Sequence, residues 1–402
     1  MTQRKGLAAA GWLINVSFPV QPNGASERPS NRHSAYTWGV YSLSNIDWSP
    51  FLGRPRLASP ALEVLDALYD TPILVSGAGG TLGSALAHRM GALSSAGLSL
   101  LDSSESRLYK LEQEWRANGT PGTPSLILGT VLNRTLLDEL FTMRSPRLIV
   151  HTAAFKNVAL LEGQPLAAIS NNVFGTHTLC RAAAANEARV VLLSTTKAVD
   201  PCSIMGATKR LAEQVALAYG GIVLRIGNVL ATRDSVTETF ASQIANGRPL
   251  TVSDPGARRF FLTLDEAVNM LLIASASSQL PIVTVPELPP PQFITDLAQF
   301  MAERLAPGRT FEIDFVGLRP GDKDQERLWS SVESPRPLDH PGMLSISTPM
   351  TPIDELENGL DALRETVDAR DLVGSLEHLQ ALVPEYVPSA NAGTAGYQRT
   401  VS

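Results

Sequence analysis

The sequence predicts an α/β fold in which a doubly wound parallel sheet is joined to a smaller C-terminal α/β lobe. Two observations support this prediction. From Thr71 onward, short apolar runs alternate with segments of helical period, which is the pattern of repeated βαβ units. The first run leads into a glycine-rich turn at 77–83, and a helical segment follows. Parallel strands connected in this way form a Rossmann-like sheet with right-handed connections.

Six short apolar runs are the expected strands, at 72–76, 98–101, 125–128, 148–151, 190–194 and 221–225. Helical segments lie between them, among them 82–92, 106–117 and 205–218. Past about residue 250 the alternation gives way to a mixed region, with a proline-rich stretch at 288–291 and a helix expected at 294–305. This change predicts that the smaller lobe follows the sheet.

The glycine-rich turn predicts a dinucleotide site. Gly77 allows the tight turn after the strand, Gly80 lets a pyrophosphate approach the backbone, and Gly83 lets the helix pack close to the sheet. The N-terminus of the helix then faces the phosphates. The residues expected around the pyrophosphate are Gly77, Gly79, Gly80, Thr81, Leu82 and Gly83. The alternative is a glycine-rich turn without a ligand.

Asp102 ends the second expected strand, nineteen residues after Gly83. A carboxylate there can accept hydrogen bonds from the adenosine ribose hydroxyls, and it would repel the 2′-phosphate of NADP. We therefore expect NAD, although the nearby Arg107 could still accommodate a phosphate, so NADP stays open. The alternative role for Asp102 is to cap the turn that begins at Ser103.

Four regions follow from these patterns. We expect a loosely ordered N-terminal arm at 1–60, because proline, asparagine, serine and tryptophan occur there without a steady period. An NAD(P)-binding Rossmann domain is expected at 61–250. A substrate-binding lobe with C-terminal helices is expected at 251–388, and a tail at 389–402.

Composition narrows the choice of partners and compartment. The 402 residues are 44% apolar and 18% charged, with a formal net charge of −6, so no basic face is available for nucleic acid. Cys180 and Cys202 are too few for a disulfide framework or a thiolate metal site, and we expect no bound metal. No apolar run is long enough to cross a bilayer. The run at 7–20 is interrupted and is a poor signal peptide, so we expect a cytoplasmic protein.

Several segments together resemble a known family. They are 77–83, 102–105, 151–158, 172–176, 194–209, 225–230 and 317–323, with weaker matches at 51–55 and 382–386. In this order they resemble the CapD-like polysaccharide biosynthesis proteins, the UDP-N-acetylglucosamine 4,6-dehydratase group of the extended short-chain dehydrogenase/reductases. The resemblance covers roughly residues 50–388. It implies the short, soluble form of the family, a UDP-sugar substrate, homo-oligomeric assembly and a role in polysaccharide or glycan synthesis.

The family reaction begins when a hydride leaves sugar C4 for the nicotinamide. A base then removes the C5 proton, an acid protonates the departing C6 hydroxyl, and the hydride returns to C6. The resemblance implies that Thr195 stabilises charge on the C4 oxygen and that Lys197 is the C5 base. Thr196 stands where the family has aspartate, and a threonine hydroxyl cannot replace a carboxylic acid at neutral pH.

A second departure from the family lies ten residues further along the chain. Met205 takes the place of the usual active-site tyrosine and has no proton to exchange, although a branch of the dehydratases also has methionine there. Lys209, one helical turn later, is expected to bind the nicotinamide ribose; the alternative is a surface lysine. Asn172 matches the asparagine that supports this site in the family, with a helix-start residue as the alternative.

The resemblance also assigns the remaining pocket residues. For the cofactor it implies Val131 beside adenine, where Thr130 replaces the usual aspartate, and Ala153. Cys202, near Met205, is a weak candidate for an acid. For the UDP-sugar it implies five residues: Lys156, Asn228, Ser235, Arg259 and Arg319, of which the two arginines would hold the diphosphate.

Three functions remain open at this point. The first is a working nucleotide-sugar 4,6-dehydratase in which another acid or a water replaces the missing carboxylate. The second is an epimerase or ketosugar reductase, because neither reaction needs an acid at C6. The third is a regulatory protein that binds the cofactor without turnover, as the joint loss of tyrosine and aspartate would allow.

Overall fold

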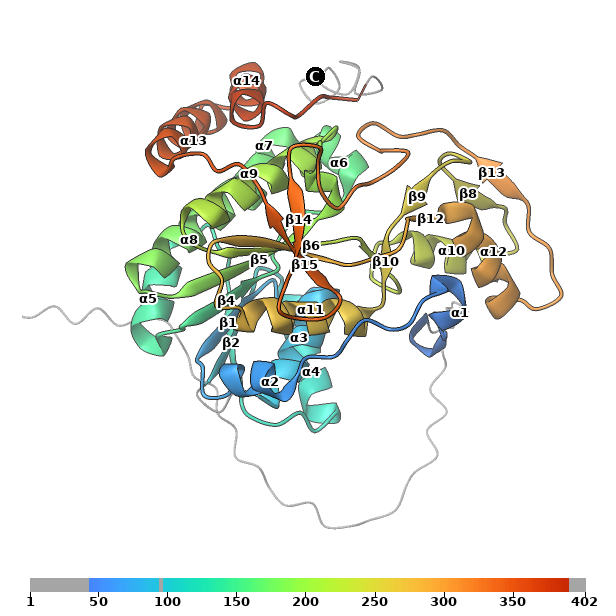
Figure 1. The fold of residues 1–402 in the computed structure, drawn as a ribbon, viewed down its shortest axis with the longest axis horizontal. Coiled ribbons are helices and arrows are strands. Elements are labelled where there is room, and N and C mark those ends of the chain that lie inside the picture. Colours follow the sequence, from blue (N-terminus) through green and yellow to red (C-terminus); the bar gives the residue numbers. More distant parts are fainter. Residues whose placement is uncertain (1–42, 94–96, 390–402) are drawn as a thin grey trace, which may run out of the picture. The chain divides into compact units, whose positions relative to one another are not determined.

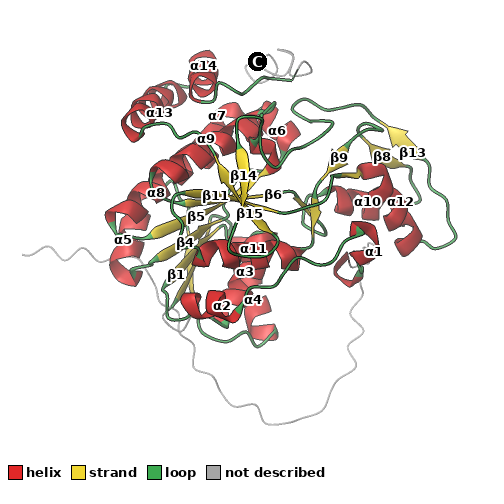
Figure 2. Ribbon diagram, in the orientation of Figure 1, coloured by secondary structure: helices red, strands yellow, loops and turns green. Residues whose placement is uncertain are grey.

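The computed structural model describes residues 43–93 and 97–389. Its main feature is a large sheet with helices on both faces (Figures 1 and 2). The strands of this sheet are β1 (Ile73–Ser76), β2 (Leu98–Asp102), β3 (Ser125–Leu128), β4 (Leu148–His151), β5 (Arg189–Thr195), β6 (Ile222–Ile226), β11 (Ile282–Pro286), β14 (Ser334–Pro337) and β15 (Met343–Ser347). All six strands expected from the sequence are present, each within one residue of its predicted bounds.

Within the described residues the sheet has nine strands in the order β14-β15-β11-β6-β5-β4-β1-β2-β3. The strands from β3 to β11 are parallel, and β15 and β14 add an antiparallel edge. The order of the first six strands, 3-2-1-4-5-6, is that of a doubly wound Rossmann sheet. The predicted fold class is therefore confirmed.

Two apolar cores cover the two faces of the sheet, because neighbouring residues of a strand point to opposite sides. Leu74 belongs to one core and Val75 to the other. The Val75 core includes α2 (Leu62–Leu68), α3 (Thr81–Gly91), α4 (Glu105–Ala117) and α11 (Leu264–Ala276). The Leu74 core includes α5 (Arg134–Arg144), α8 (Gly175–Ala185), α9 (Ile204–Ala218), α13 (Ile353–Asp368) and α14 (Leu372–Leu382).

Shorter elements connect these layers near the carboxyl ends of the strands. They are α6 (Val158–Glu162), α7 (Pro165–Ala168), the π-helix η2 (Ile169–Phe174), the 3-10 helix η3 (Thr196–Ala198), β7 (Asn228–Val229) and β10 (Phe261–Leu262). Helix η3 directly follows β5, and β7 follows β6 after one residue. Residues that follow adjacent parallel strands come close together at one edge of the sheet.

A smaller lobe has a core of its own. It contains α10 (Val236–Ala245), α12 (Ile294–Leu305), β8 (Leu250–Val252), β9 (Arg258–Arg259), β12 (Gln292–Phe293) and β13 (Ile313–Phe315). Phe240, Leu297 and Met301 lie at its centre. The range 251–388, which the sequence separates as a lobe with C-terminal helices, divides between the two parts, because β11, β14 and β15 join the large sheet.

The segment just before the sheet packs on the smaller lobe. It begins with η1 (Leu43–Asn45) and α1 (Ser49–Leu52), and the Phe51 ring meets the rings of Phe261 and Phe300. Arg54 forms an ion pair with buried Glu266. The described part of the predicted loose arm is therefore ordered, because its aromatic side chains are buried in the lobe core. Residues 1–42 of that arm, and 390–402 of the predicted tail, lie outside the described residues.

None of the helices in 43–93 and 97–389 combines the length and the apolar composition needed to span a bilayer. Both cysteines are free thiols, Cys180 in the core and Cys202 half-buried.

Candidate functional site

The turn after β1 has the geometry that its glycines predict. Gly77 has φ +73°, and a side chain there would lie 2.6 Å from the backbone nitrogen of Ala153. A side chain on Gly83 would collide with the Gly77 carbonyl oxygen. Ala153, predicted for the cofactor pocket, thus lies directly against the turn. The close approach of three backbone segments requires glycine at both positions.

The N-terminus of α3 suits a phosphate. Its first N–H groups have no acceptor within the helix, and Gly80, the N-cap, contributes no side-chain cap. The Thr81 hydroxyl accepts only a long hydrogen bond, 3.4 Å, from the Arg233 backbone. The start of α3 is therefore the kind of helix N-terminus that favours an anionic group.

Asp102 lies beside this turn at the end of β2. Its Oδ2 accepts a hydrogen bond from Gly79 N at 2.9 Å, and its Oδ1 accepts one from Ser104 N at 2.9 Å. The carboxylate thus caps the turn at Ser103 and also adjoins the glycine turn, so the two alternatives from the sequence are compatible. Because a carboxylate has about four acceptor sites, it can accept further hydrogen bonds from ribose hydroxyls. Arg107 is packed against Gly79, close to the same place.

Asn172 connects three segments of the site. Its amide donates to Phe155 O at 3.0 Å and to the Thr208 hydroxyl at 3.1 Å, and its Oδ1 accepts from Phe155 N at 2.8 Å. It lies inside the π-helix η2 and is buried, so it is not merely a helix-start residue. Val131 is buried against Gly175 at the start of α8. Asn172 therefore holds the 153–156 loop against α9.

Helix α9 carries Met205 and Lys209. The Met205 side chain is buried in the core, with no polar role. Lys209 is also buried, and its Nζ donates to Leu193 O at 2.8 Å, so the surface alternative is wrong. Burial lowers the pKa of Lys209 to about 8, although Glu213 acts in the opposite direction. The ammonium therefore lies against β5 at Leu193, two residues before the end of the strand.

The residues after β5 converge on a carboxylate that the sequence comparison did not single out. The Thr196 hydroxyl donates to Glu326 Oε2 at 2.5 Å, and Lys197 Nζ lies 2.6 Å from Glu326 Oε1. Lys197 Nζ also donates to Asn228 Oδ1 at 3.1 Å, and Thr195 Oγ1 accepts from Lys197 N at 3.4 Å. We call Thr196, Lys197, Asn228, Arg259 and Glu326 the carboxylate cluster.

Glu326 is ionised in this environment. Burial by itself would raise the pKa of its carboxyl group, but Lys197, Arg259 and the Thr196 hydroxyl together lower it. Arg259 Nε lies 3.1 Å from Oε1. Lys197 is the most exposed of the three partners, with 24% of its side chain accessible, against 1% for Glu326. A molecule in the site would therefore meet Lys197 before it meets the carboxylate.

The residues predicted for the UDP-sugar are not all brought together. Asn228 and Arg259 lie in the carboxylate cluster, but the guanidinium of Arg259 is already engaged with the carbonyls of Arg258, Lys323 and Asp324. Lys156 and Ser235 form a separate group, in which Lys156 Nζ donates to Arg233 O and Ser235 precedes α10. Arg319 is exposed and pairs with Asp322 at 2.9 Å.

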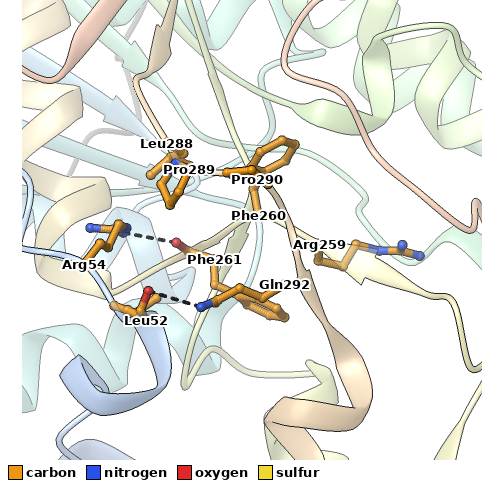
Figure 3. Close-up of a pocket in the computed structure, with 9 residues that line it drawn as sticks. All are labelled: Leu52, Arg54, Arg259, Phe260, Phe261, Leu288, Pro289, Pro290 and Gln292. Atoms are coloured by element: carbon orange, nitrogen blue, oxygen red, sulfur yellow. Dashed lines mark hydrogen bonds between the residues drawn. The ribbon is translucent and has the colours of Figure 1, made fainter.

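A small pocket beside Arg259 belongs to the packing of the lobe. Its lining includes the N-terminal segment, where Arg54 donates to Phe261 O and Gln292 donates to Leu52 O (Figure 3). The Arg259 side chain extends away from the other lining residues (Figure 3). The guanidinium thus points to the carboxylate cluster rather than into this pocket. In 43–93 and 97–389 no group of three acidic, histidine or cysteine side chains is placed to hold a metal ion.

Comparison with known proteins identifies the family. Residues 73–348 match the family model described as polysaccharide biosynthesis protein. The chain belongs to this family. The capsular polysaccharide biosynthesis protein CapD of Staphylococcus aureus is 34% identical over 308 residues, which cover 73% of this chain and 51% of CapD. The chain thus spans about half the length of that relative.

Further relatives and solved structures are similar to the chain in sequence or in fold. The UDP-glucose 4-epimerase of Rickettsia canadensis is 32% identical over 278 residues, 66% of this chain and 79% of the epimerase. The structure of Pen from Bacillus thuringiensis has a TM-score of 0.63 and 26% identity, covering 71% of this chain and 88% of Pen. DesIV of Streptomyces venezuelae, a dTDP-glucose 4,6-dehydratase solved with NAD, shares the fold at a TM-score of 0.52 and 20% identity, covering 61% of this chain and 84% of DesIV.

The family resemblance stated from the sequence is confirmed, but Glu326 was not predicted. It lies three residues after Lys323, the last residue of the recognised segment 317–323. Three acidic residues, Asp322, Asp324 and Glu326, lie in or just past this motif, and the sequence does not show which of them reaches the site. The contact of Glu326 with Thr196 spans 130 positions of the chain, so local spacing could not reveal it.

A second buried cluster, also not predicted, lies along α9 and β6. Arg225 is fully buried and pairs with Glu213 at 2.7 Å and with Glu333 at 2.8 Å. Arg210 bridges the same two glutamates at 3.3 Å each, and Ser194 donates to Glu213. We call Ser194, Arg210, Glu213, Arg225 and Glu333 the arginine cluster.

Proposed function

We propose that this chain is a nucleotide-sugar 4,6-dehydratase that acts on a UDP-N-acetylhexosamine, with UDP-N-acetylglucosamine as the first substrate to test. The carboxylate cluster carries the proposal, because it places a lysine, a hydroxyl and a buried carboxylate at the end of β5. Elimination of water next to a ketone needs both a base and an acid, and this cluster holds groups of both kinds. Family membership supports a substrate of the nucleotide-sugar class.

The residues around the glycine turn fit a dinucleotide. When bound, NAD would accept and return a hydride at the sugar. The backbone of Gly77, Gly80 and the first turn of α3 would hold the pyrophosphate, and Asp102 the adenosine ribose. Lys209 would donate a hydrogen bond to the second ribose. The carboxylate of Asp102 supports NAD over NADP.

The side chains at the end of β5 would handle protons and charge. The Thr195 hydroxyl would donate to the C4 oxygen and stabilise charge there. Lys197 Nζ would exchange the proton on the carbon beside the ketone. Asn228 and Glu326 both contact the Lys197 ammonium, and these two contacts hold Nζ in place. Three residues predicted for the substrate lie outside the carboxylate cluster: Lys156, Ser235 and Arg319. We propose that they contact the nucleotide part of the UDP-sugar.

A second candidate function is 4-epimerisation of the same class of sugar. Two observations favour it: Thr196 has no carboxyl group, and a family member of 32% identity is a UDP-glucose 4-epimerase. Epimerisation needs oxidation and reduction at C4 but no departing hydroxyl.

One assay separates these functions. The protein is incubated with UDP-N-acetylglucosamine and NAD, and the sugar nucleotide is followed by mass spectrometry and NMR. Loss of one water supports the dehydratase. An unchanged mass with inverted C4 configuration supports the epimerase. No conversion of UDP-, GDP- or dTDP-sugars would contradict both.

Lys197→Ala tests the assignment of the site. We expect turnover to fall by about 10²–10⁴-fold, because general acid–base groups contribute that much, while binding of the dinucleotide is kept. Lys110→Ala is the matched control, since Lys110 is an exposed lysine on α4 that pairs with Glu114 across one helical turn. The measurements are kcat and the dissociation constant of NADH. Equal loss in the two variants would remove Lys197 from the mechanism.

A further inference from the structure

Glu326 occupies the space beside position 196 that a carboxyl group of residue 196 would otherwise reach. Its Oε2 is 2.5 Å from the Thr196 hydroxyl, and its Oε1 is 2.6 Å from Lys197 Nζ. The two oxygens of one carboxylate thus contact the two residues that follow Thr195. The sequence shows the loss of an acid at position 196, whereas the fold brings a carboxylate to the same place from residue 326.

Both cations that pair with Glu326 also have other hydrogen-bond acceptors. Arg259 keeps three carbonyl acceptors, from Arg258, Lys323 and Asp324, without Glu326. Lys197 is partly exposed and retains Asn228 as an acceptor. Neither cation depends on Glu326 alone for its hydrogen bonds. Glu326, buried to 1% exposure, is in turn held by all three partners, so one carboxylate connects the lysine, the arginine and the Thr196 hydroxyl.

We infer that Glu326 supplies the proton that position 196 cannot supply, acting through the Thr196 hydroxyl, while Lys197 is its partner base. This inference rests on the proposed dehydratase function. Glu326 acts through Thr196 and Lys197; because Thr196 is fully buried in the structure, the relay requires that binding of the sugar opens a path to its hydroxyl. The pair of Lys197 and Glu326 holds one proton, and the proton resides on Nζ in the resting ion pair.

The elimination step balances with this single proton. With the proton on Glu326 Oε2 and Lys197 as a neutral amine, Lys197 Nζ takes the C5 proton and the electrons of that C–H bond form the C5–C6 double bond. The C6–O bond breaks as the departing hydroxyl takes the Thr196 proton and leaves as water. Thr196 Oγ1 in turn receives the proton of Glu326. The pair ends as ammonium and carboxylate, the ionised pair present in the structure.

Glu326→Gln is the direct test. Glutamine keeps the size and hydrogen-bonding groups of the side chain but cannot donate a carboxyl proton. We expect release of water from the sugar nucleotide to fall about 10²–10³-fold. Transfer of deuterium from a C4-deuterated sugar to the nicotinamide should continue, because oxidation at C4 does not use this proton. Asp324→Asn, an exposed carboxylate in the same loop, is the control.

A second variant separates chemistry from structural support. In Thr196→Asp/Glu326→Gln the carboxyl group moves from residue 326 to residue 196, so at least tenfold of the lost dehydration should return. A structural role for Glu326 would not be restored by an acid at position 196. Wild-type rates of water loss in Glu326→Gln, or a double variant no faster than the single one, would overturn the inference.

A readout without turnover distinguishes failure of this inference from failure of the proposed function. Lys197 is partly exposed, so an amine reagent with mass-spectrometric detection can report whether its Nζ is held in the ion pair. Lys197 should be labelled several-fold faster in Glu326→Gln than in the wild type, because Nζ is no longer held against the carboxylate; unchanged labelling would overturn the pairing. If the wild type releases no water from any nucleotide sugar, the dehydratase proposal fails, whatever the labelling shows.

Discussion

Two buried glutamates lie beside the end of β5, and they differ in the cations that surround them. Ser194 donates to Glu213 and Thr196 donates to Glu326, both at 2.5 Å. Glu213 is paired with two arginines, Arg210 and Arg225. Glu326 is paired with one arginine and one lysine. The two clusters therefore look alike in hydrogen bonding but not in proton chemistry.

The type of cation beside a buried carboxylate distinguishes a carboxylate that supports the fold from one that can take part in proton transfer. An arginine does not release its proton in proteins, so the arginine cluster keeps its charges and serves to join α9, β6 and the loop before β14. Lysine can exchange a proton, and Lys197 is partly exposed. We therefore assign proton transfer to the carboxylate cluster and a structural role to the arginine cluster.

The largest expected effect is on the free energy of unfolding, when one glutamate of each cluster is replaced by glutamine. Glu213→Gln leaves fully buried Arg225 with Glu333 as its one remaining carboxylate in the arginine cluster, and should lower the free energy of unfolding by about 3–5 kcal/mol. Glu326→Gln should lower it by about 1–2 kcal/mol, because both cations keep other acceptors. Urea denaturation measures both values. Equal losses would show that the two clusters have the same structural role.

The second prediction concerns Lys209, one helical turn before Glu213. Burial lowers its pKa from 10.5 to about 8 in the folded protein. Between about pH 8 and pH 10.5 the unfolded chain binds a proton that the folded chain has released, so raising the pH stabilises the folded state. The unfolding free energy of the wild type should therefore rise relative to Lys209→Met by up to about 3 kcal/mol across this window. A flat difference, measured without dinucleotide, would contradict the buried ammonium.

The smallest effect comes from removing one hydroxyl in each cluster. Ser194→Ala and Thr196→Val each delete a hydrogen bond to a carboxylate, and each should cost about 1–2 kcal/mol in the free energy of unfolding. Turnover should separate them: Thr196→Val should lose water release, and Ser194→Ala should keep it. Similar kinetics in the two variants would remove the distinction between the clusters.

Much of the fold could be predicted because its signals are local. Apolar runs predicted the six parallel strands, and glycines predicted the turn after β1. A side chain on Gly77 would collide with the backbone of Ala153, and one on Gly83 with the backbone of Gly77. Asp102 was assigned from its distance along the chain to the turn. Packing of Phe51 into the smaller lobe was not predictable, because its partners Phe261 and Phe300 are more than two hundred positions away.

By itself, the sequence determined the sheet, the glycine turn, the family and the loss of a carboxyl group at position 196. Period and spacing determine the sheet and the turn, since these depend on residues within one strand, turn or helix, whereas the family and the departure at position 196 followed from the resemblance of the motifs. Only the tertiary structure decided that Glu326 stands beside Thr196 and Lys197, and that Arg259 faces this carboxylate. The physical reason is that a buried charge is placed by all the cations and donors that surround it, and here they come from segments far apart in the chain.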